Sequence, residues 1–200
     1  MATFCYLIGD AQSGNCALID PAFETGRILA EVKDSGYRVT HIINTHAHTD
    51  HTAGNQAIKS ATAAKLLIHE LDAGRLVNIF NKAFARVLGG KGSPRPDVLL
   101  KDNDIIQIGE LPLRVLHTPG HTAGGICIYL DGNIFTGDTL FVGAVGRTDL
   151  PGGSPKQLLA SIREKIYTLP GRTIVWPGHD YGPRPSSTVE HEKNTNPYTR

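Results

Sequence analysis

The first half of the chain alternates short apolar runs with turn residues and is interrupted by helical patterns. Short, largely β-branched runs bounded by Gly, Pro or Asp are typical of strands. On this basis we predict strands at residues 3–8, 17–19, 39–43 and 65–68. Ile28, Leu29 and Val32 share one face of a helix predicted over residues 24–36. Further helical patterns cover residues 55–60 and, less regularly, 71–88.

The second half predicts more strands and one well-marked helix. The strands are expected at residues 104–108, 113–116, 126–130, 133–135 and 173–176. Ser154, Pro155 and Gln157 suit an N-cap, a first helical position and a capping-box partner, so a helix is predicted from residue 154 to about residue 169. The segment 71–96 ends in a Gly- and Pro-rich stretch that suits a loop bordering a pocket. We therefore expect residues 1–200 to form one domain.

Composition and charge exclude several classes of partner. The 200 residues are 40% hydrophobic and 20% charged, with a formal net charge of +1. This balance gives no general field for nucleic acid or for an anionic membrane surface. The N-terminus lacks the pattern of a signal peptide and no stretch is long and apolar enough to span a membrane, so a cytoplasmic location is expected. The protein is expected to be a monomer or a small homo-oligomer.

The cysteines and several histidines are expected to have structural positions. Cys5, Cys16 and Cys127 lie far apart among apolar residues without a C-x-x-C pair, which is typical of reduced core thiols. His41 and His117 alternate with apolar residues in predicted strands, and we expect them in the core or just behind a site. By contrast, His69 and His191 are expected at the surface.

The candidate chemistry is densest in residues 45–51, directly after the predicted strand 39–43. This segment reads Thr-His-Ala-His-Thr-Asp-His and supplies His46, His48, Asp50 and His51. Imidazole nitrogen and carboxylate oxygen are the ligands that hold Zn²⁺ or Fe²⁺ in proteins. The sequence therefore predicts a metal site here.

Three further polar residues follow predicted strands, and each comes directly after a glycine. They are His121, Asp138 and His179. Glycine before such a residue lets the backbone turn sharply and approach a ligand closely. Together with the first cluster they make seven candidate ligands, which suffice for two ions if one carboxylate bridges them.

In this order the seven residues match the H-x-H-x-D-H signature, later His, Asp and final His of the metallo-β-lactamase superfamily, which the chain resembles over nearly its whole length. The resemblance implies an α/β fold, an αββα sandwich of two mixed β-sheets packed face to face and flanked by helices. It implies that one metal is bound by His46, His48, His121 and Asp138. It implies that the second is bound by Asp50, His51, Asp138 and His179, with Asp138 as the bridge. Two Zn²⁺ ions are favoured, with Fe²⁺ or a mixed Zn/Fe pair as alternatives.

One branch that this chain resembles is glyoxalase II, the hydroxyacylglutathione hydrolases. Residues 136–142 match that branch, and Arg147 and Tyr181 fall where it contacts glutathione. The resemblance implies a metal-dependent hydrolase of a thioester such as an S-acylglutathione. A metal-bridging hydroxide would attack the thioester carbonyl, and Asp50 would be the catalytic residue that ligates and orients it.

The second branch is persulfide dioxygenase, which residues 3–10 and 146–149 also resemble. It implies a single Fe²⁺ held by His46, His121 and Asp138, with open positions for O₂ and glutathione persulfide. Residues 71–96 form a longer segment than these dioxygenases carry and resemble the lid of the hydrolases, so the hydrolase is favoured. A non-catalytic metal-binding scaffold is a third hypothesis, disfavoured because a scaffold needs no open coordination position.

Overall fold

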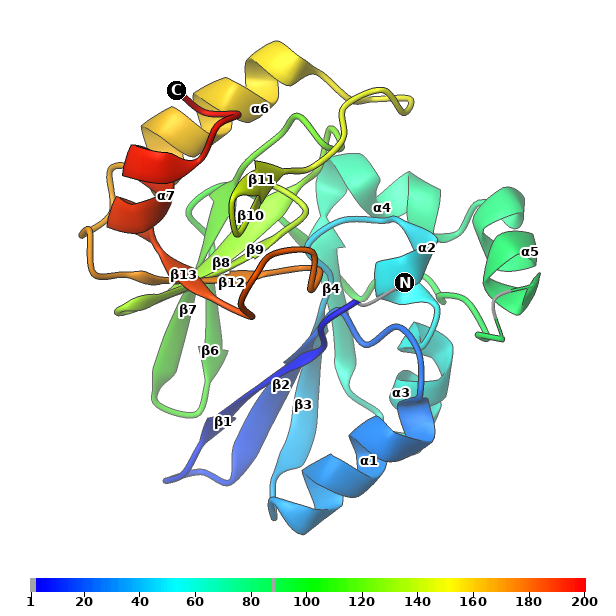
Figure 1. The fold of residues 1–200 in the computed structure, drawn as a ribbon. Helices are drawn as coiled ribbons and strands as arrows, with labels where there is room; N and C mark the ends of the chain where they lie inside the picture. Colours follow the sequence, from blue (N-terminus) through cyan, green and yellow to red (C-terminus); the bar gives the residue numbers. More distant parts are fainter. Residues whose placement is uncertain (1–2, 88) are drawn as a thin grey trace.

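Two β-sheets pack face to face in the centre of the molecule, and helices cover the outer face of each sheet (Figure 1). The computed structural model describes residues 3–87 and 89–200, apart from the side chains of Ile79, Phe80, Lys82 and Phe84. This arrangement is the predicted αββα sandwich. Among the described residues, none of the helices combines the length and the apolar character needed to cross a membrane.

The first sheet has five strands and is mixed. Its strand order is β1 (Tyr6–Asp10), β2 (Asn15–Ile19), β3 (Arg38–Ile43), β4 (Lys65–His69) and β5 (Val98–Leu100). The β1–β2 pair is antiparallel, and the remaining neighbours are parallel. Because parallel strands share a carboxyl edge, the loops that follow β2, β3 and β4 emerge on the same side of this sheet.

The second sheet has six strands and is also mixed. Its strand order is β13 (Ser187–Thr188), β12 (Ile174–Pro177), β9 (Asn133–Gly137), β8 (Ile126–Leu130), β7 (Leu111–His117) and β6 (Ile105–Ile108). Only β12 and β9 run parallel to each other. A separate hairpin of β10 (Leu140–Phe141) and β11 (Ala144–Val145) follows β9.

The helices are distributed over the two outer faces. Those beside the first sheet are α1 (Thr25–Asp34), α2 (Thr49–Thr52), α3 (Asn55–Thr62) and α4 (Glu70–Leu76). α5 (Ile79–Val87) lies farther out, next to α2 and α4. Those beside the second sheet are α6 (Pro155–Ser161), which continues into a π-helical turn at Ile162–Ile166, and α7 (Val189–Thr195).

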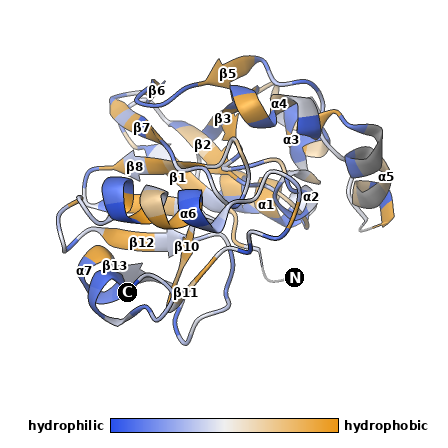
Figure 2. Cartoon of the chain, turned by 90° about the horizontal axis from the view of Figure 1, so that it is seen from above, coloured by the Kyte–Doolittle hydropathy of each residue, from blue (hydrophilic) through white to orange (hydrophobic). Residues whose placement is uncertain are grey.

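The central strands are buried on both faces, which explains apolar runs such as Leu66–Ile68 of β4 and Ile126–Ile128 of β8. Neighbouring residues on β3 illustrate this, because Ile43 packs between the sheets whereas Ile42 packs under the helices of the first sheet. Ile162 and Ile166 cover the outer face of the second sheet in the same way. Figure 2 shows the apolar strands enclosed by helices that carry polar residues outward.

The N-terminal residues cross from the first sheet to the end of the second. Thr3 forms an isolated bridge with His179, and the Phe4 amide donates to the Gly178 carbonyl at 2.9 Å. The Tyr6 hydroxyl donates to the Pro177 carbonyl at 2.6 Å. The strand predicted from residue 3 therefore becomes a regular strand only at Tyr6.

Most predicted elements are present, and the differences concern mainly short elements. The helical pattern at 71–88 divides into α4 and α5. The short elements α2, β5, β10, β11, β13 and α7 have no counterpart in the prediction. Ser154 is the predicted N-cap of α6, and its hydroxyl accepts from the Gln157 amide at 3.3 Å. Cys16 and Cys127 are buried and Cys5 is half-buried, and all three are free thiols, as expected.

Candidate metal centre

Residues 45–51 form a tight loop and a single helical turn at the carboxyl edge of the first sheet. His46 and His48 lie in the loop after β3, whereas Asp50 and His51 belong to α2, for which His48 is the N-cap. β3 lies between β2 and β4, so this segment emerges from the middle of the sheet. His46 and His51 are fully buried, and Asp50 is partly open to solvent.

The second sheet supplies the other three predicted donors from its own strand ends. His121 follows β7, Asp138 follows β9 and His179 follows β12. Because β9 and β12 are parallel neighbours, Asp138 and His179 leave the sheet side by side. The preceding glycines are conformationally required at two of these corners, since φ is +137° at Gly120 and +48° at Gly137.

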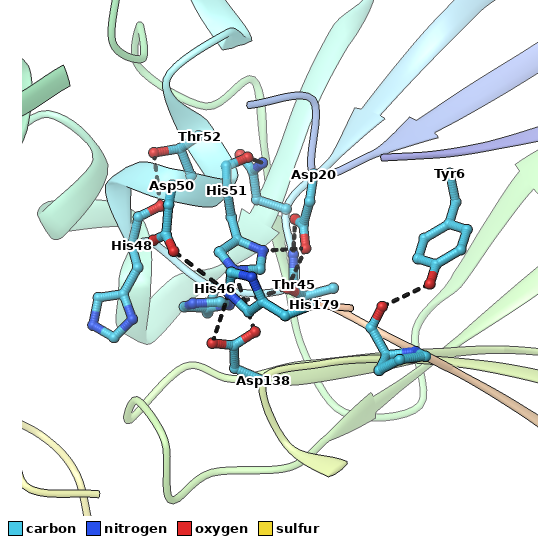
Figure 3. Close-up of polar contacts among 12 residues, drawn as sticks. Tyr6, Asp20, Thr45, His46, His48, Asp50, His51, Thr52, Asp138 and His179 are labelled. Atoms are coloured by element: carbon cyan, nitrogen blue, oxygen red, sulfur yellow. Dashed lines mark hydrogen bonds and ion pairs between the residues drawn. The ribbon is translucent and has the colours of Figure 1, made fainter. Parts of the chain in front are cut away.

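Asp138 lies directly below the imidazoles of His46, His51 and His179 in the view of Figure 3. Its Oδ1 is 3.2 Å from Nε2 of His51. Its Oδ2 is 3.5 Å from Nε2 of His121 and 3.4 Å from Nε2 of His179. The structure therefore brings donors from both sheets to one carboxylate, as a bridging position requires.

The predicted donors other than Asp138 form two groups, and Asp138 contacts members of both. Within each group the ligand atoms lie within 4.8 Å of one another, and the groups are His46, His48 and His121, and Asp50, His51 and His179. A third overlapping group combines Asp20 with His46 and His51. All seven residues predicted from the sequence are thus close together.

Unsatisfied polar atoms show that the site fits divalent ions. Within the described part of the chain, the buried Nε2 of His46 and Nδ1 of His179 have no hydrogen-bond partner. Nδ1 of His48 lies 2.8 Å from Nε2 of His121, although two neutral imidazoles can share only one proton there. Buried polar atoms are nearly always paired, so converging nitrogen atoms of this kind suit a cation.

The pKa values of the site residues divide the histidines into two kinds. Burial, with the neighbouring His51, lowers the pKa of His46 well below its ordinary value, and burial with His121 lowers that of His48 to about 4. Burial opposes protonation of His179 too, but Asp138 and Asp50 raise its pKa to about 9. His46 and His48 are therefore neutral, as metal ligands must be. At His179 a bound cation could take the place of the proton beside the two carboxylates.

The carboxylates of the site are anionic at neutral pH. Burial alone would raise the pKa of Asp138, but His51 and His179 lower it well below its ordinary value. Burial likewise opposes ionisation of Asp50, and a hydrogen bond from His179 lowers its pKa overall. The site thus carries two negative charges that a bound cation would compensate.

Asp20 is a functional residue that the sequence analysis missed. It is buried, and its Oδ2 lies 2.9 Å from Nδ1 of His51. The same carboxylate accepts from the Thr45 amide at 2.8 Å and from the Thr45 hydroxyl at 2.6 Å. Asp20 therefore orients His51 and the start of residues 45–51, the metal loop. Its Asp-Pro context at a strand end indicated only a turn.

The two predicted substrate-binding residues lie beside a cavity of about 570 Å³ that includes Asp50 and Asp138 in its wall. The Tyr181 ring stacks on His179 with centroids 4.5 Å apart and is 60% exposed. The Arg147 carbonyl accepts from Nδ1 of His121 at 2.7 Å, whereas its guanidinium pairs with Asp149 through two 2.7 Å contacts.

The other histidines meet the expectations only in part. His191 is exposed, as expected, whereas His41 and His117 are only half-buried and lie outside the core clusters. His69, predicted at the surface, is buried instead and stacks on His117 with centroids 4.1 Å apart. It is the last residue of β4 and pairs with Leu100 of β5, the edge strand that the sequence pattern did not reveal.

Comparison with known proteins agrees with this geometry. Residues 1–179 match the family model of the metallo-β-lactamase superfamily. The chain belongs to the metallo-β-lactamase superfamily. Its histidine and aspartate clusters are those of a metal-binding member of this superfamily.

Two kinds of superfamily relative are about equally similar to the chain. Human mitochondrial persulfide dioxygenase ETHE1 is 36% identical over 198 residues, which cover 98% of this chain and 70% of the relative. Hydroxyacylglutathione hydrolase from Polaromonas sp. is 36% identical over 182 residues, which cover 89% of this chain and 62% of the relative. Identity alone therefore does not separate hydrolase from dioxygenase.

Solved structures of the superfamily superpose closely on the chain. The B3 metallo-β-lactamase BLEG-1 has a TM-score of 0.88 at 31% identity, covering 98% of this chain and 94% of that structure. TTHA1623, solved in a di-iron-bound form, has a TM-score of 0.83 at 34% identity, covering 97% and 93%. The superfamily fold is thus shared over nearly the whole chain.

Proposed function

We propose that this superfamily member hydrolyses a thioester, such as an S-acylglutathione, with two divalent metal ions. The proposal is carried by the division of the donors into two groups that share Asp138. One is the His46, His48 and His121 group, and the other is the Asp50, His51 and His179 group. If only one ion were bound, one of these two groups of residues would have no metal ion to bind.

The residues proposed to hold the ions are those of the two groups, with Asp138 as the bridge. Zn²⁺ is favoured by the imidazole and carboxylate donors, and the di-iron form of TTHA1623 supports iron or a mixed pair as alternatives. When bound, such ions polarise a carbonyl oxygen and lower the pKa of water toward neutrality.

Asp50 is proposed as the catalytic residue of the chain. Its carboxylate lies on the cavity wall, 3.4 Å from Nε2 of His179, and is anionic because its pKa is lowered. An anionic oxygen at this place can accept a hydrogen bond from the attacking water and orient its lone pair toward the thioester carbonyl.

Tyr181 and Arg147 are proposed to bind the thiol portion of the substrate. The Tyr181 hydroxyl can donate a hydrogen bond to a carboxylate of the thiol. The Arg147 guanidinium can also donate to such a carboxylate, provided that it divides its hydrogen bonds between the substrate and Asp149. The acyl group would lie against the apolar wall of the cavity, formed by Phe141, Val145 and Leu150. A small molecule, rather than a nucleic acid or a membrane, suits a cavity of this size and lining.

The free thiols support a reducing location, and we propose the cytoplasm. The proposed oligomeric state is a monomer or a small homo-oligomer. Neither the location nor the oligomeric state changes the chemistry proposed for the site.

Persulfide dioxygenase activity is the second candidate, favoured by one observation. The match to human persulfide dioxygenase covers 198 residues, against 182 for the hydrolase. In this alternative His46, His121 and Asp138 hold a single Fe²⁺ and glutathione persulfide is the substrate. Both alternatives use the same cavity.

Elemental analysis of protein purified without a metal-binding tag or chelator tests the proposal first. About two equivalents of zinc or iron per chain, with hydrolysis of lactoylglutathione, is the expected result. About one equivalent of iron, with oxygen uptake on adding glutathione persulfide, would replace the hydrolase with the dioxygenase. Fully metallated protein inactive toward both substrates would indicate a non-catalytic metal-binding domain.

A further inference from the structure

A fully buried carboxylate outside the donor set lies directly behind the metal loop. Asp72 is in the first turn of α4, and none of its surface is exposed to solvent. It does not line the cavity beside the proposed ions. Burying a carboxylate is costly unless hydrogen bonds compensate for the lost water, so its partners indicate what it does.

Asp72 joins the two chain segments that supply the first donor group. Its Oδ2 accepts from the Ala47 amide at 2.9 Å and from the Thr122 hydroxyl at 2.8 Å. Its Oδ1 accepts from the Gly124 amide at 2.9 Å. Ala47 lies between His46 and His48. Thr122 and Gly124 lie within three residues after His121, the third donor of that group.

Both backbone polar groups of Ala47 are hydrogen-bonded to side chains. While Asp72 accepts from its amide, the Asn81 side chain of α5 donates to the Ala47 carbonyl at 3.2 Å. Asn81 also donates to the Arg75 carbonyl at 2.8 Å, which fixes its orientation. The backbone between His46 and His48 therefore has little freedom to rotate.

The loop on the other side approaches Asp72 too closely for any side chain. A Cβ atom at Gly124 would lie 2.6 Å from the Asp72 amide nitrogen and 2.8 Å from its Cβ. The glycine thus permits the hydrogen bond between the Gly124 amide and the carboxylate. The segment that carries His48 and the segment that carries His121 meet at the site, where Nδ1 of His48 lies 2.8 Å from Nε2 of His121.

From these contacts we infer that Asp72 is a positioning residue for the first metal ion. It sets the spacing between the His46–His48 pair and His121, although it touches neither an ion nor a substrate. The inference rests on the proposed metal centre. Residues that orient metal ligands through hydrogen bonds typically change metal affinity by about 10- to 100-fold when they are replaced.

The test compares Co²⁺ binding to wild type, Asp72→Ala and Asp72→Asn, each prepared free of metal. Asp72→Asn keeps the shape of the side chain, but its NH₂ group must face at least one of the present donors, so it disturbs the same contact with less risk of misfolding. Affinities are measured by competition with a chromophoric chelator, and the visible absorption of bound Co²⁺ reports its coordination. We expect the affinity of the first ion to fall by about 10-fold or more.

Asp10→Asn is the matched control, because Asp10 is a buried carboxylate with a similar set of partners. It accepts from the amides of Ser13 and Glu110 at 3.0 and 3.2 Å, which belong to two separate segments. It lies at the far end of β1 from the site. This variant should lower the melting temperature without changing Co²⁺ affinity or its absorption spectrum.

The outcomes separate this inference from the proposed function. If Asp72→Asn and Asp10→Asn both lose thermal stability while both bind Co²⁺ as wild type does, Asp72 is only structural and the inference fails. If wild type itself binds no Co²⁺, the proposed metal centre fails first. Weaker Co²⁺ binding with an altered spectrum in the Asp72 variants alone supports the positioning role, whatever substrate the enzyme takes.

Discussion

Asp138 is the residue on which the proposed centre depends most, because it contacts donors from both sheets. Replacing it with alanine removes the shared carboxylate and leaves His51 and His179 without the charge that raises their pKa values. We expect Asp138→Ala to purify with almost no metal and to lack activity while its circular dichroism spectrum stays native. The exposed neighbour of His179, substituted as Asp180→Asn, should keep its metal. A normal metal content in Asp138→Ala would refute the bridging assignment.

Arg147 and Tyr181 should affect substrate binding rather than the chemical step. In Tyr181→Phe we expect KM for an S-acylglutathione to rise about 10-fold with little change in kcat, because a hydrogen bond to a charged group contributes about 1.5–3 kcal/mol. Arg147→Ala should have a smaller effect, since Asp149 already occupies its guanidinium. A thioester of a small neutral thiol is the control substrate, and its KM should not change. Equal losses with both substrates would argue against a thiol-binding role.

At the residue scale, the sequence revealed donors but not the groups that orient them. The seven donors were predictable because their types and spacing match a signature, and the structure places them together. Asp20 and Asp72 were not predictable, since each acts through hydrogen bonds to backbone amides that are distant in the sequence. The pairing of Arg147 with Asp149 was equally hidden, although only two residues separate them.

At the scale of elements, periodicity predicted the strands that are buried on both faces and missed the short ones. β5 has three residues and lies at a sheet edge, so it carries too little pattern to be recognised. The helix predicted over 154–169 is regular only to Ser161. Beyond it, the Tyr167 amide donates to the Ile162 carbonyl at 2.8 Å, a five-residue spacing that no apolar pattern distinguishes from an α-helix.

The corner before His121 should be intolerant of any side chain. Gly120 has φ of +137°, and a Cβ there would lie 2.2 Å from the Leu158 amide of α6. We expect Gly120→Ala to lower the free energy of unfolding by about 2 kcal/mol or more and to weaken metal binding, because the loop must move away from α6. Chemical denaturation and metal titration measure the two effects.

Gly132→Ala serves as the control for that corner. Its φ is +77°, but no atom lies within 4 Å of the added Cβ, so it introduces backbone strain without a clash. A loss of about 1 kcal/mol with unchanged metal affinity is expected. If Gly120→Ala and Gly132→Ala lost the same stability and both kept wild-type metal affinity, the contact between Gly120 and α6 would not position His121.

At the scale of the whole molecule, bound ions should stabilise the packing of one sheet against the other. The first sheet supplies His46, His48, Asp50 and His51, and the second supplies the remaining donors. An ion that binds only the folded chain adds about 2.7 kcal/mol to its stability when free ion is at 100 times Kd. For a chain of this size, removal of metal by a chelator should lower Tm by roughly 5–10 °C. Scanning calorimetry tests this, and Asp138→Ala should show no chelator effect.

The crossing of the N-terminal residues to the end of the second sheet has a consequence for the order of assembly during translation. Phe4 is synthesised well before its partner Gly178 and the adjacent donor His179. The first donor group is complete once His121 has emerged. The second donor group stays incomplete until His179 has been made, so the first donor group can assemble while the second cannot.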